Sequence, residues 1–153
     1  MSRSSPPATS HRPPATRALA LILLAIPALA ADQCPWLNSA TAVGILGGQV
    51  QTAVTPTACE FTRPAAVLRI EVTSAAVPHT QCPRKSESLK AIGNEANACA
   101  YEGKPGWLGE QVTGRVRDQA FLVRVSTSDP HAAPKTLREK ARNIAEQVAG
   151  FLF

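Results

Sequence analysis

The sequence predicts an α+β domain: a twisted antiparallel sheet with an N-terminal and a C-terminal helix packed on it, held by two disulfides. Short segments between residues 50 and 126 alternate apolar and polar side chains, which is typical of strands with one buried face. Residues 134–152 instead repeat apolar side chains every three or four positions, which indicates an amphipathic helix. The four cysteines and the hydrophobic fraction of 44% fit a small disulfide-linked domain with an ordinary core.

The first 30 residues have the order of a secretory signal peptide. Three arginines lie in a stretch without acidic residues, an apolar run follows at 18–29, and Ala-Leu-Ala at 28–30 suits cleavage. The run is shorter than the roughly 20 apolar residues of a membrane span, so we expect membrane contact only through the uncleaved signal during export. A retained anchor is the alternative. A single domain at 31–153 is then expected in the periplasm or outside the cell.

Part of the positive charge belongs to this leader. Three of the 16 Lys and Arg residues lie in the first 30 positions, whereas all 11 acidic residues follow them. The exported domain is therefore only weakly basic, which argues against a nucleic-acid partner.

All four cysteines, Cys34, Cys59, Cys82 and Cys99, lie in the exported part. An even number in an exported chain indicates two disulfides, for which three pairings exist. We favour Cys34–Cys59 and Cys82–Cys99, because sequential pairing ties each segment to the next strand. Without a Cys-x-x-Cys motif or a suitably spaced histidine, we expect no metal site, no cofactor and no redox chemistry.

The helix expected first in the exported part covers residues 34–48. Pro35 suits its first position, and Gly47-Gly48 suit its end. One face would carry Leu37, Ala40, Val43 and Gly44.

Short strands are expected to follow this helix, with turns at the prolines between them. In the clearest one, at 67–73, Leu68, Ile70 and Val72 share a face. The remaining expectations are strands at 50–54, 59–62 and 98–101, an exposed connection at 74–87, a helical turn at 86–92 and a turn at 102–106.

The strongest long-range feature is a hairpin at 111–126. A turn at Asp118-Gln119 would place Val116 opposite Phe121 and Val112 opposite Val125. After a break at 128–134, Pro134 opens the closing helix. Its buried stripe is expected to contain Leu137, Ala141, Ile144, Val148 and Phe151 or Leu152, with an exposed Arg142–Glu146 pair.

The sequence contains no recognisable catalytic motif, so we assign no catalytic residue and predict that the chain is not an enzyme. His79 and His131 lie in proline-rich segments. Serine, aspartate and histidine occur together at 126–131, but a capped turn explains that cluster better than a triad, whose members come from distant segments.

Four arginines are the candidate binding residues. Arg115, Arg117 and Arg124 should project from the hairpin face opposite its valines, and Arg69 joins them if its strand is adjacent. Such a face could bind an anionic small molecule, a lipid head group or an envelope polysaccharide. The alternative is an ordinary solvated face. Trp36 and Trp107 could serve as exposed handles, but we expect them at the rim of the core.

Several short motifs resemble small secreted bacterial proteins related to LpqN lipoproteins and to the extracellular sensor domain of the PknH kinase. The matching segments are Cys34-x-x-Leu37, Ile45-Leu46-Gly47, Cys59-x-Phe61, 68–72, 92–96 and 114–125. The resemblance implies a disulfide-linked α+β fold in the cell envelope and, by analogy, ligand sensing or binding. It brings no catalytic residues.

Together these observations predict a non-enzymatic binding or sensor-like module of the bacterial envelope. Two alternatives stay open: a small secreted hydrolase that uses His79 or His131, and an inhibitor of a secreted enzyme that presents the loop at 76–85.

Overall fold

The computed structural model of the chain describes residues 33–74 and 85–153. Its strands form one seven-stranded antiparallel sheet in the order β1-β2-β3-β7-β6-β5-β4. The elements are α1 (Ser39–Leu46), β1 (Gln51–Thr55), β2 (Ala58–Arg63), β3 (Ala66–Thr73), β4 (Glu87–Leu89), β5 (Glu95–Ala100), β6 (Leu108–Val116), β7 (Gln119–Thr127) and α2 (Pro134–Leu152). The predicted leader, its cleavage site and most of the expected connection at 74–87 lie outside the described residues.

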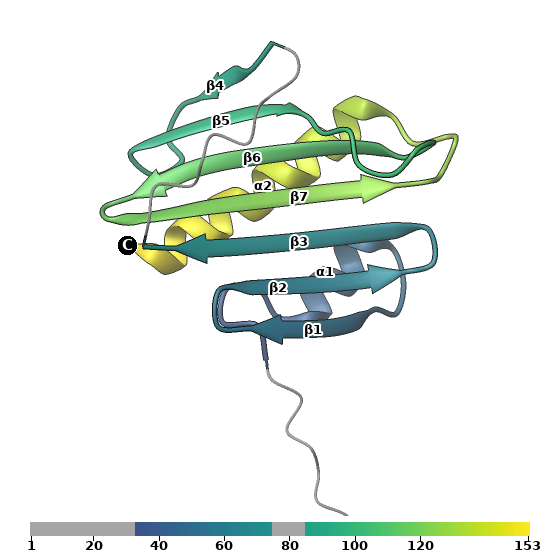
Figure 1. Cartoon of the computed structure of the whole chain (residues 1–153), viewed down its shortest axis with the longest axis horizontal. Coiled ribbons are helices and arrows are strands. Elements are labelled where there is room, and N and C mark those ends of the chain that lie inside the picture. The colour runs from purple at the N-terminus through teal and green to yellow at the C-terminus, as the bar shows by residue number, and fades with distance from the viewer. Residues whose placement is uncertain (1–32, 75–84) are drawn as a thin grey trace, which may run out of the picture.

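Both helices lie on the same face of the sheet (Figure 1). α1 packs against β2 and β3, and α2 packs against β6 and β7. The α+β class, with one helix before the strands and one after them, is therefore confirmed. Within the described part, neither helix is long and apolar enough to cross a membrane.

The core lies between the sheet and the helices. In β3 the alternation predicted from sequence is confirmed, because Leu68, Ile70 and Val72 are buried and the residues between them are partly exposed. α2 buries the expected stripe from Leu137 to Val148. At its end Leu152 is partly buried while Phe151 is 67% exposed, so Leu152 completes the stripe.

The first helix begins later than the sequence predicts. Its first residue is Ser39 rather than Pro35, and the side chain of the preceding Asn38 accepts a hydrogen bond of 2.8 Å from the Thr41 N–H. The helix therefore buries Ala42 and Leu46, whereas Ala40 and Gly44 of the predicted face are exposed. Its expected end is confirmed, since Gly47 has a φ of 78°.

Residues 86–92 do not form the expected helical turn. Residues 87–89 pair with β5 as an edge strand, and β5 itself begins at Glu95, earlier than predicted. The connection is held by Asn94, whose N–H donates to the Arg115 carbonyl and whose Oδ1 accepts from the Arg117 N–H, both at 2.7 Å. These contacts with the distant hairpin are not visible in the local sequence.

The hairpin of β6 and β7 is confirmed, but its expected register is wrong by two residues. The turn consists of Arg117 and Asp118, and Gly114 rather than Val116 lies opposite Phe121. A Cβ on Gly114 would lie 2.3 Å from the Phe121 ring, so the missing side chain makes room for the ring. A shift of two keeps every side chain on its face, which explains why the valines are buried as expected.

One disulfide, Cys34–Cys59, is seen in the described part of the chain, as the sequence predicts. It joins the segment before α1 to β2, with a Cα–Cα distance of 5.7 Å. Cys99 carries no free thiol, but its predicted partner Cys82 lies outside the described residues. The second pairing therefore stays a prediction.

A buried carboxylate lies under α2. Glu110 of β6 has a side chain only 3% exposed, and Arg138 of α2 donates to both of its oxygens at 3.2 and 3.3 Å. The same guanidinium reaches Glu87 of β4 at 3.3 Å. The hydrogen bond with Glu110 is the main cause that raises the pKa of Arg138. This ion pair joins the helix to the sheet.

Gly114→Ala should destabilise the fold by about 1–3 kcal/mol, because the new methyl group overlaps the Phe121 ring. Chemical denaturation measures the effect. The loss should shrink in a Phe121→Leu background, which removes the overlapping ring atoms. Gly44→Ala is the matched control: its Cβ would meet nothing within 4 Å, so it should stabilise α1 by about 0.5–1 kcal/mol. An unchanged stability in Gly114→Ala would contradict the observed register.

Arg138→Met should lower the free energy of unfolding by about 2–3 kcal/mol, because Glu110 would then be buried without its partner. Adding Glu110→Leu to this variant should recover most of the loss. Arg142→Met serves as the control, since it breaks the exposed pair with Glu146 and should cost less than about 0.5 kcal/mol. Equal effects of the two arginine substitutions would refute the structural role of Glu110.

Candidate functional site

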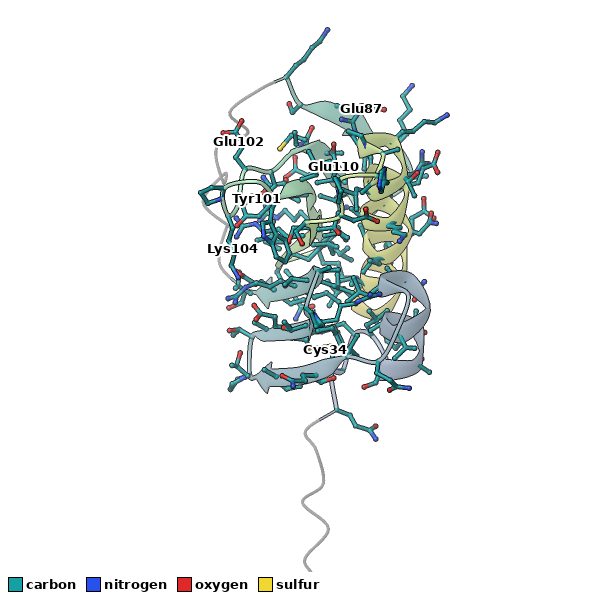
Figure 2. The ribbon with its side chains drawn as sticks, turned by 90° about the vertical axis from the view of Figure 1, so that its right-hand side faces the viewer. Cys34, Glu87, Tyr101, Glu102, Lys104 and Glu110 are labelled. Atoms are coloured by element: carbon teal, nitrogen blue, oxygen red, sulfur yellow. A yellow bond between two sulfur atoms is a disulfide. The ribbon has the colours of Figure 1, made fainter. Side chains whose placement is uncertain are left out.

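The sheet face opposite the helices, called the outer face below, carries polar and charged residues. Figure 2 shows Tyr101 and Lys104 on this side and Glu110 towards α2. Strand alternation assigns to it Glu60, Arg69, Glu71, Gln111, Arg115 and Arg124, since each of them neighbours a residue of the buried face.

Two arginines meet at the centre of the outer face. Arg69 of β3 and Arg124 of β7 are direct cross-strand partners. Like charges directly opposite each other destabilise a sheet. Each guanidinium therefore needs other contacts, and the two obtain them in different ways.

Arg69 is neutralised by carboxylates. Its Nε donates to Glu71 at 2.6 Å and its Nη1 donates to Glu60 at 3.1 Å. The hydrogen bond with Glu71 is the largest cause that raises the pKa of Arg69, and Glu60 adds to it while partial burial opposes it. This arginine is a charge-balanced part of the face.

Arg124 has a different environment. Its Nε donates to Gln111 at 3.2 Å, and its guanidinium lies 4.6 Å from the centre of the Tyr101 ring. Gln111 is itself 2% exposed and its amide nitrogen lies 3.4 Å from the Cys99 sulfur. Across the described ranges, 33–74 and 85–153, Arg124 forms no ion pair. Within the part of the chain that the structure describes, its positive charge is held by an amide and an aromatic ring and has no carboxylate partner.

The loop between β5 and β6 forms the rim of this site. Tyr101 packs beside Gly109, where an added Cβ would lie 2.9 Å from the ring, and its N–H donates to the Gly109 carbonyl at 2.8 Å. At the other end of the loop, the Trp107 N–H donates to the Lys104 carbonyl at 3.0 Å. The Lys104 Nζ lies 5.3 Å from the centre of the Trp107 ring. The loop thus supplies a second cation stacked on an aromatic ring.

These residues enclose a hollow of about 320 Å³, called the central hollow below. Its charged and aromatic lining consists of Glu60, Arg69, Glu71, Tyr101, Lys104, Trp107 and Arg124. A hollow of about 510 Å³ adjoins it at Lys104 and Trp107, and another of about 220 Å³ adjoins it at Arg69. The depression therefore runs across the outer face rather than ending in one cup.

Only two of the four predicted arginines come together. Arg69 and Arg124 line the central hollow, but Arg115 pairs with Ala120, four residues along β7 from Arg124, or about 13 Å. Arg117 lies in the hairpin turn with a φ of 55°, and its carbonyl accepts a hydrogen bond from the Arg115 Nε. Arg115 and Arg117 therefore lie at the turn end of the β6–β7 hairpin, away from the central hollow.

The aromatic and lysine residues of the loop were not in the predicted site. Trp107 lines the central hollow and does not contribute to the rim of the core, whereas Trp36 packs against the core as expected. A local signal is present: glycines at 103, 106 and 109 lie close in sequence to Tyr101 and Trp107, and an added Cβ at Gly103 or Gly109 would meet the Tyr101 ring. Which strands lie under the loop is set by the sheet order alone.

His131 lies at a different hollow, of about 600 Å³, at the N-terminal end of α2. The neighbouring Asp129 uses Oδ1 to accept the backbone N–H of His131 at 2.9 Å, and its own N–H donates to the Thr127 hydroxyl. The segment is a capped turn. The described residues contain no group of three or more potential metal ligands, and His79 lies outside them.

Comparison of the chain with models of protein families, with curated proteins and with solved structures gives no significant match.

Proposed function

We propose that this chain is an exported, non-enzymatic binding module of the bacterial envelope whose central hollow binds an anionic ligand. One observation carries the proposal: Lys104 and Arg124, two cations without carboxylate partners in the described structure, line one hollow, each against an aromatic ring. A carboxylate, sulfate or phosphate would receive charge-assisted hydrogen bonds there. The rings keep both cations in place before the ligand arrives.

The shape of the depression favours an acidic glycan among anionic ligands. The three adjoining hollows form a track from β7 and the β5–β6 loop across β3 and β2 to β1, which suits a chain of linked units. Tyr101 and Trp107 offer apolar ring surfaces beside the cations, and a sugar ring has an apolar face as well as its acidic group. The glutamates that pair with Arg69 can accept hydrogen bonds from sugar hydroxyls.

An envelope location agrees with the other features. The disulfide Cys34–Cys59 is compatible with an oxidising compartment. The signal-like leader and the resemblance to LpqN-like and PknH-like envelope proteins support export and ligand binding by analogy. For His131 the hydrolase alternative has weaker support, because the Oδ1 of Asp129, the acidic residue nearest to it in sequence, accepts the backbone N–H of His131 in a capped turn.

The experiment is a calorimetric titration with oligogalacturonate, an acidic glycan, and with a neutral malto-oligosaccharide of equal length. We expect binding of the acidic glycan only, weakened by added salt. Arg124→Met should weaken it by about tenfold or more, which corresponds to the loss of a charge-assisted hydrogen bond. Glu60→Gln should strengthen it, because it removes a competing negative charge from the hollow.

Arg115→Met is the matched control, since this arginine lies on the same face but outside the central hollow. It should leave the affinity unchanged, and thermal unfolding should show that both arginine variants are folded. Equal losses in the two variants would mean that binding follows overall charge, and would refute the site. Binding of vesicles with anionic lipids in place of the glycan would identify a lipid head group as the source of the anion.

A further inference from the structure

The two edges of the sheet differ in how they are protected. β4 has only three residues, begins with Glu87 and is flanked by Lys85 and Lys90. Short length and charge are the usual means by which natural sheets prevent edge-to-edge pairing. β1 has five residues, Gln51–Thr55, with neither charge nor proline, and four of them are exposed. The edge formed by β1 therefore lacks the protection that β4 has.

The hydrogen-bonding groups at this edge can be assigned. The Val72 N–H donates to the Thr57 carbonyl at 2.9 Å, so odd-numbered residues of β2 bond to β3 and even-numbered ones bond to β1. The partners of these even residues in β1 are Gln51, Ala53 and Thr55. Thr52 and Val54 must then direct their N–H and C=O groups outward. In the described sheet no strand pairs with that side of β1.

We propose that β1 pairs with β1 of a second copy of this chain, antiparallel, about a two-fold axis at Ala53. Residue 52 of each copy then lies opposite residue 54 of the other, which forms four backbone hydrogen bonds between the outward groups. Each chain directs four such groups outward, one N–H and one C=O from each of Thr52 and Val54. No other antiparallel register centred on this strand pairs all of them. The result is one continuous sheet across both chains.

The side chains of β1 suit this register. At the axis Ala53 faces Ala53 of the second copy in a non-hydrogen-bonded pair, where the two backbones come closest and a small side chain avoids a clash. Gln51 faces Thr55, so no like charges meet. On the helix side Val54, which is already partly buried against the core, gains contact with Thr52 of the second copy.

Pairing also joins the two outer faces. Gln51 lines the hollow of about 510 Å³, while Ala53 and Thr55 line the one of about 220 Å³, so the depressions of both copies would meet at the axis. Only the role of the joined depressions in ligand binding rests on the proposed function. The dimer itself does not require a ligand.

Sedimentation velocity of the purified chain over a concentration series, without ligand, tests the pairing. A single strand pair is a small interface, so we expect a reversible dimer with a dissociation constant in the micromolar range. Ala53→Lys and Ala53→Glu should each weaken the dimer by about tenfold or more, because like charges meet at the axis. An equimolar mixture of these two variants should dimerise again, because opposite charges then meet.

Ser88→Lys places the same charge on the other edge strand, β4, where the residue is also exposed, and should leave dimerisation unchanged. A wild-type chain that is monomeric throughout the series overturns the proposal and leaves the edge to other partners, such as an extended peptide. A dimer that persists in Ala53→Lys, or one that Ser88→Lys disrupts, also overturns it. Glycan binding is measured separately, so either proposal can fail without the other.

Discussion

The pairing of β3 with β7 is the constraint on which the rest of the molecule depends. These strands join the N-terminal hairpin to the C-terminal half of the sheet over eight residue pairs. On the helix side the register is fixed by fully buried contacts such as Leu68 opposite Val125. The same register forces Arg69 against Arg124 on the outer face. A shift of one residue would expose the apolar side chains of the core, so Arg69 and Arg124 must both stay on the outer face, where the observed pairing sets them directly opposite each other.

The two arginines of this pair are stabilised by different kinds of contact. Two glutamates balance Arg69, whereas a neutral amide and a tyrosine ring hold Arg124. A sheet selected for stability alone would place a carboxylate or an apolar side chain opposite Arg69. Natural sequences depart from local preference mainly at functional sites, so the unpaired charge that Arg124 keeps among the described residues is the physical reason for our proposal that a ligand binds there.

Much of the fold could be predicted from the sequence because its signals are local. Alternation identifies the strand that contains Leu68 and the hairpin valines, and a regular stripe identifies α2. The errors concern features set by distant contacts. The hairpin register depends on how Gly114 receives the Phe121 ring, and the segment before β5 is fixed by Asn94 against the hairpin turn. Periodicity does not reveal the register, because a shift of two residues leaves the pattern of buried side chains unchanged. It does not reveal the Asn94 contact either, because Asn94 and Arg117 are far apart in the sequence.

The candidate site could be predicted only in part for the same reason. The sequence predicts the correct face for Arg69, Arg115 and Arg124, whereas Arg117 lies in the hairpin turn. Strand alternation does not give the register between strands, so it groups Arg115 and Arg117 with residues from which they are well separated. The loop that carries Lys104 and Trp107 has no periodicity, and its position over the sheet follows from the order β3-β7-β6-β5. The helices cover one face of the sheet, while the loop shapes the other face. The core can therefore stay constant while substitutions in the loop and at outer-face positions change the charge and shape of the central hollow, where we propose that the ligand binds.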